Sequence, residues 1–128
     1  MNTISDAFGI HENALRLRSQ RLELLAANIA NSDTPNFKAK DIDFKVALSR
    51  AQEIGLKSTD GRHFAFVQDG GNGNGVRFRV PFNASADGNT VEMSVEQSQY
   101  GKAAADYRAS LMFIESRSAS FKKALRGE

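Results

Sequence analysis

Two carboxylates offer the first candidate for chemistry in this sequence. Asp41 and Asp43 stand on either side of one residue in KDIDFK, a spacing that could pair them as general acid and base. They alternate, however, with Ile42 and Phe44 between two lysines, which is typical of a surface strand or turn anchored by its apolar members. A catalytic pair also needs a pocket that shifts its pKa values, and an extended chain has little means to build one. We therefore expect no enzyme activity.

Patterns that could hold a metal or a phosphate are incomplete. His11 and His63 lie far apart in a chain without cysteine, so they do not form a zinc site. The glycine-rich stretch DGGNGNG is followed by neither GK[ST] nor a helix, which excludes a P-loop. As a calcium-binding repeat it is a single copy, with Gly75 in the place of the ligand aspartate. We interpret it as the tip of a hairpin and expect no metal and no cofactor.

Composition and charge indicate one domain without a nucleic-acid surface. The chain has 128 residues, of which 41% are hydrophobic and 25% charged, and its net charge of +2 is spread evenly. The largest basic cluster falls in the last turns of an expected helix, where cations complement the helix dipole. No apolar run approaches the roughly 20 residues of a membrane span, and the first residues do not form a Sec-type signal. We therefore expect neither nucleic acid binding nor membrane insertion, and export, if any, without a cleaved signal peptide.

The N-terminal segment, residues 1–31, predicts a long helix with Ser5 or Asp6 as its N-cap. It carries two apolar rows that each repeat every seven residues and lie about 200° apart around the helix. The first row is Phe8, Leu15, Leu22 and Ile29, reinforced by Leu25 and Ala26, and the second is Ile10, Leu17 and Leu24. Two rows on different faces require two packing partners.

The C-terminal segment, residues 94–128, predicts a second long helix. Ser94 with Gln97 forms a capping-box pattern, and Gly127 is a suitable stop. Between them runs a heptad seam of Tyr100, Ala104, Tyr107, Leu111, Ile114, Ser118, Phe121 and Leu125. Met112 and Phe113 lie off this seam, so the helix has apolar surface left over after one partner is bound.

The middle of the chain, residues 32–93, predicts a turn and a β-hairpin. HFAFV (63–67) and VRFRVPF (76–82) alternate as strands do and flank the glycine-rich tip, with Arg77 and Arg79 on one side and Pro81 at the strand end. We therefore expect a mainly α fold in one structural unit: long N- and C-terminal helices paired as a coiled coil, with a small β-hairpin between them. Such a rod would expose apolar surface, which predicts self-assembly or a permanent partner.

The stretch LAANIANSDTPNFK ends the first helix and redirects the chain. Its alanines allow close approach, and the amides of Asn28 and Asn31 can bond to a neighbouring backbone. Pro35 pushes Thr34 out of helical geometry, and Pro35 with Asn36 suits a type II turn in which Asn36 takes a positive φ. The turn motif comprises Asp33, Thr34, Pro35, Asn36 and Phe37.

Two blocks of the sequence resemble bacterial flagellar axial proteins, the rod, hook and hook-associated group. LLAANIANSDTPNFKAKDIDF resembles their N-terminal signature, and its KDIDF end is similar to proximal-rod members in particular. FRVPFNASADGNTVEMSVEQ is similar to the segment that leads into the C-terminal helix of the same proteins. The chain departs from the family at Asn36 and Phe37, where glycine and tyrosine are usual.

The resemblance implies a structural subunit of the flagellar basal-body rod, exported unfolded by the type III apparatus. It would assemble helically in the periplasm with itself and other rod proteins, near the rod-base adaptor and the inner-membrane (MS) ring, and transmit torque. Phe44 to Leu48 matches a short export-signal pattern that is read at the export gate. The alternative is a cytoplasmic coiled-coil adaptor or export chaperone that forms a small closed oligomer.

The apolar rows and the amides near the turn together define the expected assembly interface. Its members are Phe8, Leu15, Leu17, Leu22, Leu25, Asn28, Ile29, Asn31, Tyr100, Tyr107, Leu111, Ile114, Phe121 and Leu125.

Overall fold

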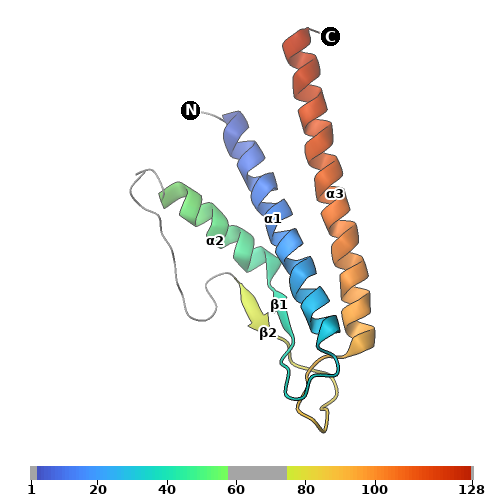
Figure 1. Cartoon of the computed structure of the whole chain (residues 1–128). Coiled ribbons are helices and arrows are strands. Elements are labelled where there is room, and N and C mark those ends of the chain that lie inside the picture. Colours follow the sequence, from blue (N-terminus) through green and yellow to red (C-terminus); the bar gives the residue numbers. More distant parts are fainter. Residues whose placement is uncertain (1–2, 58–74, 128) are drawn as a thin grey trace.

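The computed structural model describes residues 3–57 and 75–127 and shows a mainly α chain. The elements in order are α1 (Thr3–Ala30), β1 (Lys40–Ile42), α2 (Phe44–Lys57), β2 (Val76–Phe78) and α3 (Met93–Arg126). Helices α1 and α3 run antiparallel and side by side, so that the start of α1 and the end of α3 lie at the same end of the molecule (Figure 1). The expected pairing of long N- and C-terminal helices around a small β element is confirmed.

The helix ends are only partly as expected. Gly127 closes α3 in the left-handed conformation at φ 74°, and its N–H points to the carbonyl oxygens of the last turn. The capping box was a wrong prediction, since α3 begins at Met93 with Glu92 as its N-cap and no side-chain cap, and Ser94 lies inside the helix. Likewise α1 begins at Thr3, so neither of its predicted N-caps precedes the helix. The Glu92 carboxylate accepts instead from the Phe82 N–H at 2.7 Å, so this side chain binds the preceding loop and not the first turn of α3.

Helix α2 was not predicted, and it explains the second apolar row of α1. Leu17 is buried against Ile42 and Ala47, and Leu24 packs on the same cluster together with Phe44, Leu48 and Val76. The second partner that this row requires is thus α2 and the sheet of the same chain. KDIDF contains the strand, but the helix starts within it, at Phe44.

The sheet consists of β1 and β2 in antiparallel register, with Asp41 opposite Arg77. The predicted hairpin partner HFAFV lies outside the described residues, so the hairpin itself stays a prediction. Arg77 and Arg79 both contact acids in or next to β1, Arg77 with Asp43 at 3.6 Å and Arg79 with Asp41 at 2.8 Å, and Arg79 also pairs with the buried Glu96.

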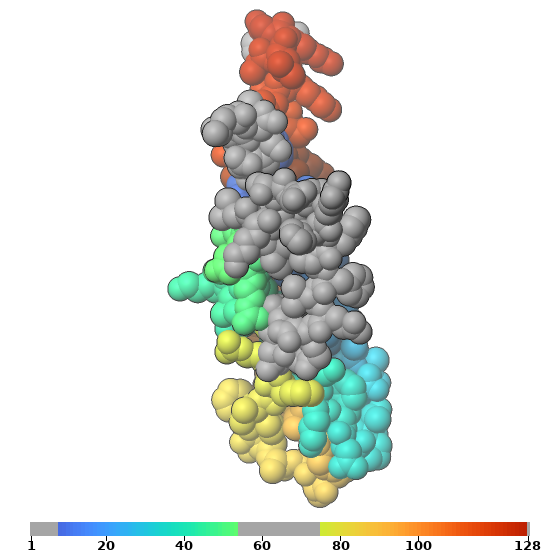
Figure 2. All heavy atoms as spheres, turned by 90° about the vertical axis from the view of Figure 1, so that its left-hand side faces the viewer, coloured from blue at the N-terminus to red at the C-terminus, as the bar shows by residue number. Residues whose placement is uncertain are grey.

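Burial is uneven along the helix pair. The molecule is elongated, with the turn after α1 and the chain leading into α3 at one end and the tip of α3 at the other (Figure 2). We call the turn end the base. Toward the tip, α1 and α3 touch through ring contacts, Phe8 with Phe121 at 5.3 Å and His11 with Phe113 at 4.5 Å between centroids. None of the helices in the described ranges has an apolar stretch that would cross a membrane.

Candidate assembly site

Asn28 joins α1 to the sheet at the base of the molecule. Its amide nitrogen donates to the Lys40 carbonyl at 2.8 Å, and its amide oxygen accepts from the Lys40 N–H at 3.1 Å. The side chain therefore pairs with β1 as a neighbouring strand would, and closes that edge of the sheet. The same nitrogen also donates to Glu96 at 3.1 Å, which ties in α3. The expected bond from this amide to a neighbouring backbone is confirmed.

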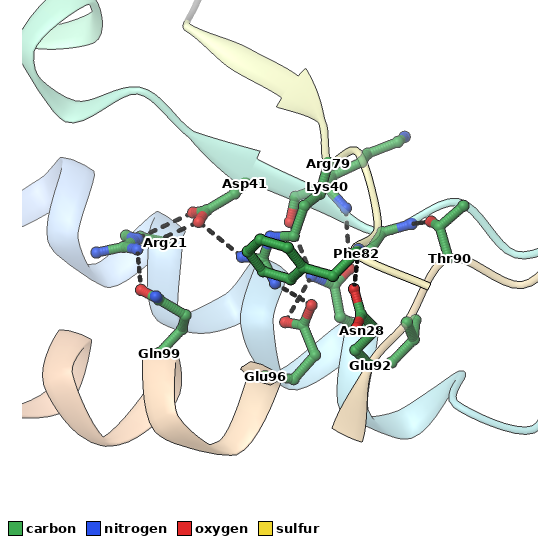
Figure 3. Close-up of polar contacts among 12 residues, drawn as sticks. Arg21, Asn28, Lys40, Asp41, Arg79, Phe82, Thr90, Glu92, Glu96 and Gln99 are labelled. Atoms are coloured by element: carbon green, nitrogen blue, oxygen red, sulfur yellow. Dashed lines mark hydrogen bonds and ion pairs between the residues drawn. The ribbon is translucent and has the colours of Figure 1, made fainter. Parts of the chain in front are cut away.

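A network of charged side chains connects all elements at the base (Figure 3). The Arg21 Nε of α1 donates to Asp41 Oδ1 of β1 at 2.9 Å, and its Nη2 donates to Gln99 of α3 at 2.9 Å. Arg79 follows β2 and donates to Asp41 Oδ2 at 2.8 Å and also to Glu96. The two arginines thus alternate with two carboxylates, and each carboxylate has more than one donor.

The contact between Asn28 and Glu96 lies in the buried part of the network. Glu96 is 0% exposed and Asn28 is 1% exposed. A carboxylate without solvent is tolerated only when it is paired and hydrogen-bonded, and Arg79 and Asn28 meet that need for Glu96. Removing Arg79 would leave the buried charge of Glu96 unpaired, and removing Asn28 would take away one of its donors, so the network favours one arrangement of the base.

The same contacts shift the pKa values of Asp41 and Arg21. Burial alone would raise the pKa of Asp41, but hydrogen bonds from Arg21, the Ile42 N–H and Arg79 outweigh it and lower that pKa. The pKa of Arg21 is raised by its bond to Asp41, against the opposing effect of burial. Asp41 therefore acts as an ionised tether, and neither group is suited to exchange protons near neutral pH.

Asn89, which precedes α3, binds the turn that follows α1. Its side-chain nitrogen lies 2.8 to 3.0 Å from the carbonyl oxygens of Asn31, Ser32 and Thr34. Because all three carbonyls belong to the turn that follows α1, this buried amide holds the turn against the chain that leads into α3. Its oxygen accepts from the Val91 N–H at 2.8 Å, which fixes the side chain in place.

The turn after α1 has the predicted conformation. Asn36 has a φ of 61°, the one positive φ outside glycine among the described residues, and the Phe37 N–H donates to the Thr34 carbonyl across the turn. The Asn36 N–H donates to the Asp87 carbonyl at 2.9 Å. A Cβ added to Gly88 would lie 2.5 Å from the Asn36 side-chain oxygen. The two loops of the base therefore fit together closely at this point.

The predicted interface residues lie in three environments. Leu17, Leu25 and Asn28 are buried within the chain, and Tyr100, Leu111 and Leu125 are exposed. The remaining members are half-buried: Phe8, Leu15, Leu22, Ile29, Asn31, Tyr107, Ile114 and Phe121. The exposed members are the ones available to another chain.

The predicted turn residues and the predicted export-signal residues also differ in their exposure. Asp33 to Asn36 are exposed and Phe37 is half-buried. The ring of Phe44 lies beneath the Arg18 guanidinium, 4.4 Å from the centroid, and Leu48 packs on the core cluster. In the folded chain the export pattern is therefore engaged in internal packing.

Sequence reasoning missed Arg21, Arg79, Asn89 and Glu96 as members of the base. A usable signal was present, because the two family-like blocks, residues 24–44 and 78–97, contain all of these except Arg21. The structure shows that the same two blocks bind one another, through pairs such as Asn28 with Glu96 and Asp41 with Arg79. The two blocks, which are far apart in the sequence and resemble the same family, therefore contact each other in the folded chain.

Comparison with known proteins agrees with the resemblance of both blocks. The family model described as "Flagella basal body rod protein" matches residues 8–38, which cover most of α1 and the turn. The flagellar basal body rod protein FlgB of Aeromonas hydrophila is 44% identical over 95% of this chain and 94% of its own length. The FlgB protein of Cereibacter sphaeroides is 42% identical over the whole of both chains. The FlgB protein of Salmonella typhimurium is 33% identical over 99% of this chain and 98% of its own.

The chain belongs to the FlgB family of flagellar basal body rod proteins. FlgB-family proteins are structural and not enzymatic, which agrees with the interpretation of Asp41 as a tether. Family membership extends over the base as well as over the helices, since the alignment with the Cereibacter sphaeroides protein leaves out no segment.

Proposed function

We propose that this FlgB-family chain is a rod subunit that packs against neighbouring subunits around a central channel. Helices α1 and α3 would form the packing surface, and the assembly would carry torque from the inner-membrane ring to the distal rod and hook. The role is mechanical, because it depends on rigid helices held in a fixed relation at the base.

One row of side chains on α3 carries the proposal. Met93, Tyr100 and Leu111 are exposed, although all are large and apolar. They are separated by seven and eleven residues, close to two and three helical turns, so they lie on one face. We call this row the α3 flank. It lies beside the face that meets α1, and its exposed apolar groups are suited to a second helix.

We extend the same proposal to the partners and the location of the chain. The chain would associate with itself and with other rod proteins, near the rod-base adaptor and the MS ring, after export through the type III gate without a cleaved signal. Export of an unfolded chain would suit the Phe44 to Leu48 pattern, because these residues are packed internally once the chain has folded. The periplasmic rod would then be the place where the base network forms.

A comparison of two double-lysine variants of α3 in the host tests the role of the α3 flank. A strain without the gene is complemented with Tyr100→Lys/Leu111→Lys or with the matched control Ala105→Lys/Ser116→Lys. Both pairs are eleven residues apart and exposed, but the control pair lies on another face. We expect the flank variant to lose swimming in soft agar and rods in isolated basal bodies, while the control keeps both. Normal swimming by the flank variant, with normal helix content in the purified protein, would contradict the proposal.

A further inference from the structure

A cavity of about 230 Å³ lies where the three helices meet. Its walls are Arg18 and Arg21 of α1, Phe44 at the start of α2, and Ala103 and Asp106 of α3. It opens to solvent, since the side chains of Arg18 and Asp106 remain 26% and 39% exposed. The cavity adjoins the charged network through Arg21, but none of the α3 flank residues lines it.

Arg18 is held rigidly in one wall of this cavity. Its guanidinium lies over the Phe44 ring, 4.4 Å from the centroid, and its Nη1 pairs with Asp106 Oδ2 at 3.3 Å. The Nε of Arg18 is buried, yet it has no hydrogen-bond partner among the residues that the structure describes. A buried donor without a partner is costly, and such groups are rare in native proteins. Arg18 therefore brings a fixed and unsatisfied donor to the site.

Arg21, one turn further along α1, shows what the same edge of a guanidinium can hold. Its Nε and Nη2 donate to the two oxygens of Asp41, at 2.9 and 3.2 Å (Figure 3). This is the paired geometry in which a planar guanidinium binds a planar carboxylate. The acidic partner of Arg18, Asp106, contacts Nη1 instead and leaves Nε open. A second carboxylate at Arg18 would repeat the arrangement of Arg21.

The charge around the cavity permits a further carboxylate. The lining residues and their immediate neighbours in sequence include four basic side chains and two acidic ones: Arg18, Arg21, Lys45 and Lys102 against Asp43 and Asp106. Asp41, which Arg21 binds, reduces this excess but does not reverse it, and Glu96 is offset by Arg79. The nearest opposing charge is that of Asp106, which shares Arg18 with the site.

We propose that the cavity binds one carboxylate group from outside the chain, held side-on by the Nε edge of Arg18. Phe44 and Ala103 would cover its apolar side. Because α1, α2 and α3 all contribute walls, a bound carboxylate would stabilise the packing of the three helices. A small free carboxylate and the acidic side chain of a second copy present the same pair of oxygens to Arg18. The inference goes beyond the proposed function and does not depend on it.

A titration of the dilute, isotopically labelled protein with sodium acetate provides the test. Ionic strength is held constant with sodium chloride, and the Arg18 Nε–H resonance is followed by NMR up to about 100 mM acetate. For a ligand of four heavy atoms we expect a saturable shift that is half complete at about 10 mM. The Arg21 Nε–H, which is already bonded to Asp41, is the internal control and should keep its position. Chloride alone should cause no saturable shift.

Three variants separate the fork of donors from charge alone, with the Ala103 amide resonance as the readout. Arg18→Lys keeps the positive charge but lacks the fork, so acetate should no longer shift this resonance. The matched control is Arg16→Lys, at an exposed position of α1, which should bind acetate as the unchanged protein does. Asp106→Asn keeps an acceptor for Nη1 and removes the nearest negative charge, so acetate should bind about three- to fivefold more tightly. If circular dichroism shows that Arg18→Lys loses its helices, Asp106→Asn decides the matter.

A dilution series without acetate separates the two sources of the carboxylate. An Arg18 Nε–H shift that grows with protein concentration assigns the group to a second copy, and a constant position assigns it to a small solute. The inference is overturned if acetate causes no saturable shift of this resonance or if chloride causes the same shift. It is equally overturned if folded Arg18→Lys binds acetate like the unchanged protein, or if Asp106→Asn binds it no more tightly.

Discussion

At the scale of single residues, the turn after α1 shows how closely the two loops of the base fit. Asn36 takes a positive φ, and its side-chain oxygen occupies the space beside Gly88. Asparagine tolerates this conformation better than other residues with a side chain. The positive φ was predictable because Pro35 and Asn36 restrict the turn locally, whereas the contact with Gly88 depends on the fold.

A substitution at Gly88 tests this fit. Gly88→Ala places a Cβ 2.5 Å from the Asn36 oxygen at a φ of +74°, so we expect the free energy of unfolding to fall by about 1 to 3 kcal/mol. The matched control is Gly101→Ala in α3, where nothing lies within 4 Å of the new Cβ and the helix should gain about 0.5 to 1 kcal/mol. Urea unfolding of both variants measures the difference. Equal effects at the two positions would contradict the close fit.

At the scale of elements, the charged network fixes how α1, β1 and α3 meet. Because hydrogen bonds hold the pKa of Asp41 below its ordinary value, the ionised form stabilises the folded chain. That stability is fully present above the unfolded pKa of about 3.9 and is lost as the pH falls through the lower, folded pKa.

The lowered pKa of Asp41 predicts how the stability of the variant Asp41→Asn depends on pH. At pH 7 we expect the variant to unfold at a clearly lower urea concentration than the unchanged protein, since Arg21 and Arg79 lose their charged partner. The gap between the two midpoints should narrow as the pH falls below about 4. Asp33→Asn, at an exposed carboxylate, serves as the control and should unfold like the unchanged protein at both pH values. A gap that stays constant with pH would show that the charge of Asp41 does not contribute.

The elements also show what the sequence could and could not predict. The long helices α1 and α3 follow from apolar periodicity and from Gly127, which act locally. Helix α2 was missed because the alternation in KDIDF favours a strand, although a local signal was present: Asp43 precedes α2, and its carboxylate accepts from the Val46 N–H at 3.3 Å. The inward position of Arg79 could not be read from alternation either, since it requires Asp41 and Glu96 from distant segments.

At the scale of the whole molecule, burial is concentrated near the base. On α1 the buried residues are Leu17, Leu25 and Asn28, and on α3 they are Glu96 and Ala103. Among the described residues nearer the tip, 8–16 on α1 and 104–127 on α3, every side chain is half-buried or exposed. Local stability follows the density of buried contacts, so the monomer should be firm at the base and loose at the tip.

Hydrogen exchange measures this gradient along the chain. In dilute monomer we expect amides of α1 around Leu25 and of α3 around Ala103 to exchange slowly, and amides from Phe113 to Phe121 to exchange much faster, although all are helical. The single ring contacts of His11 and Phe8 are too few to hold the tip closed. If neighbouring subunits also cover the exposed end of α3, assembly should slow exchange there more than at the base, because the base amides are already protected in the monomer. Uniform protection along α3 in the monomer would show instead that the helix pair is complete without neighbours.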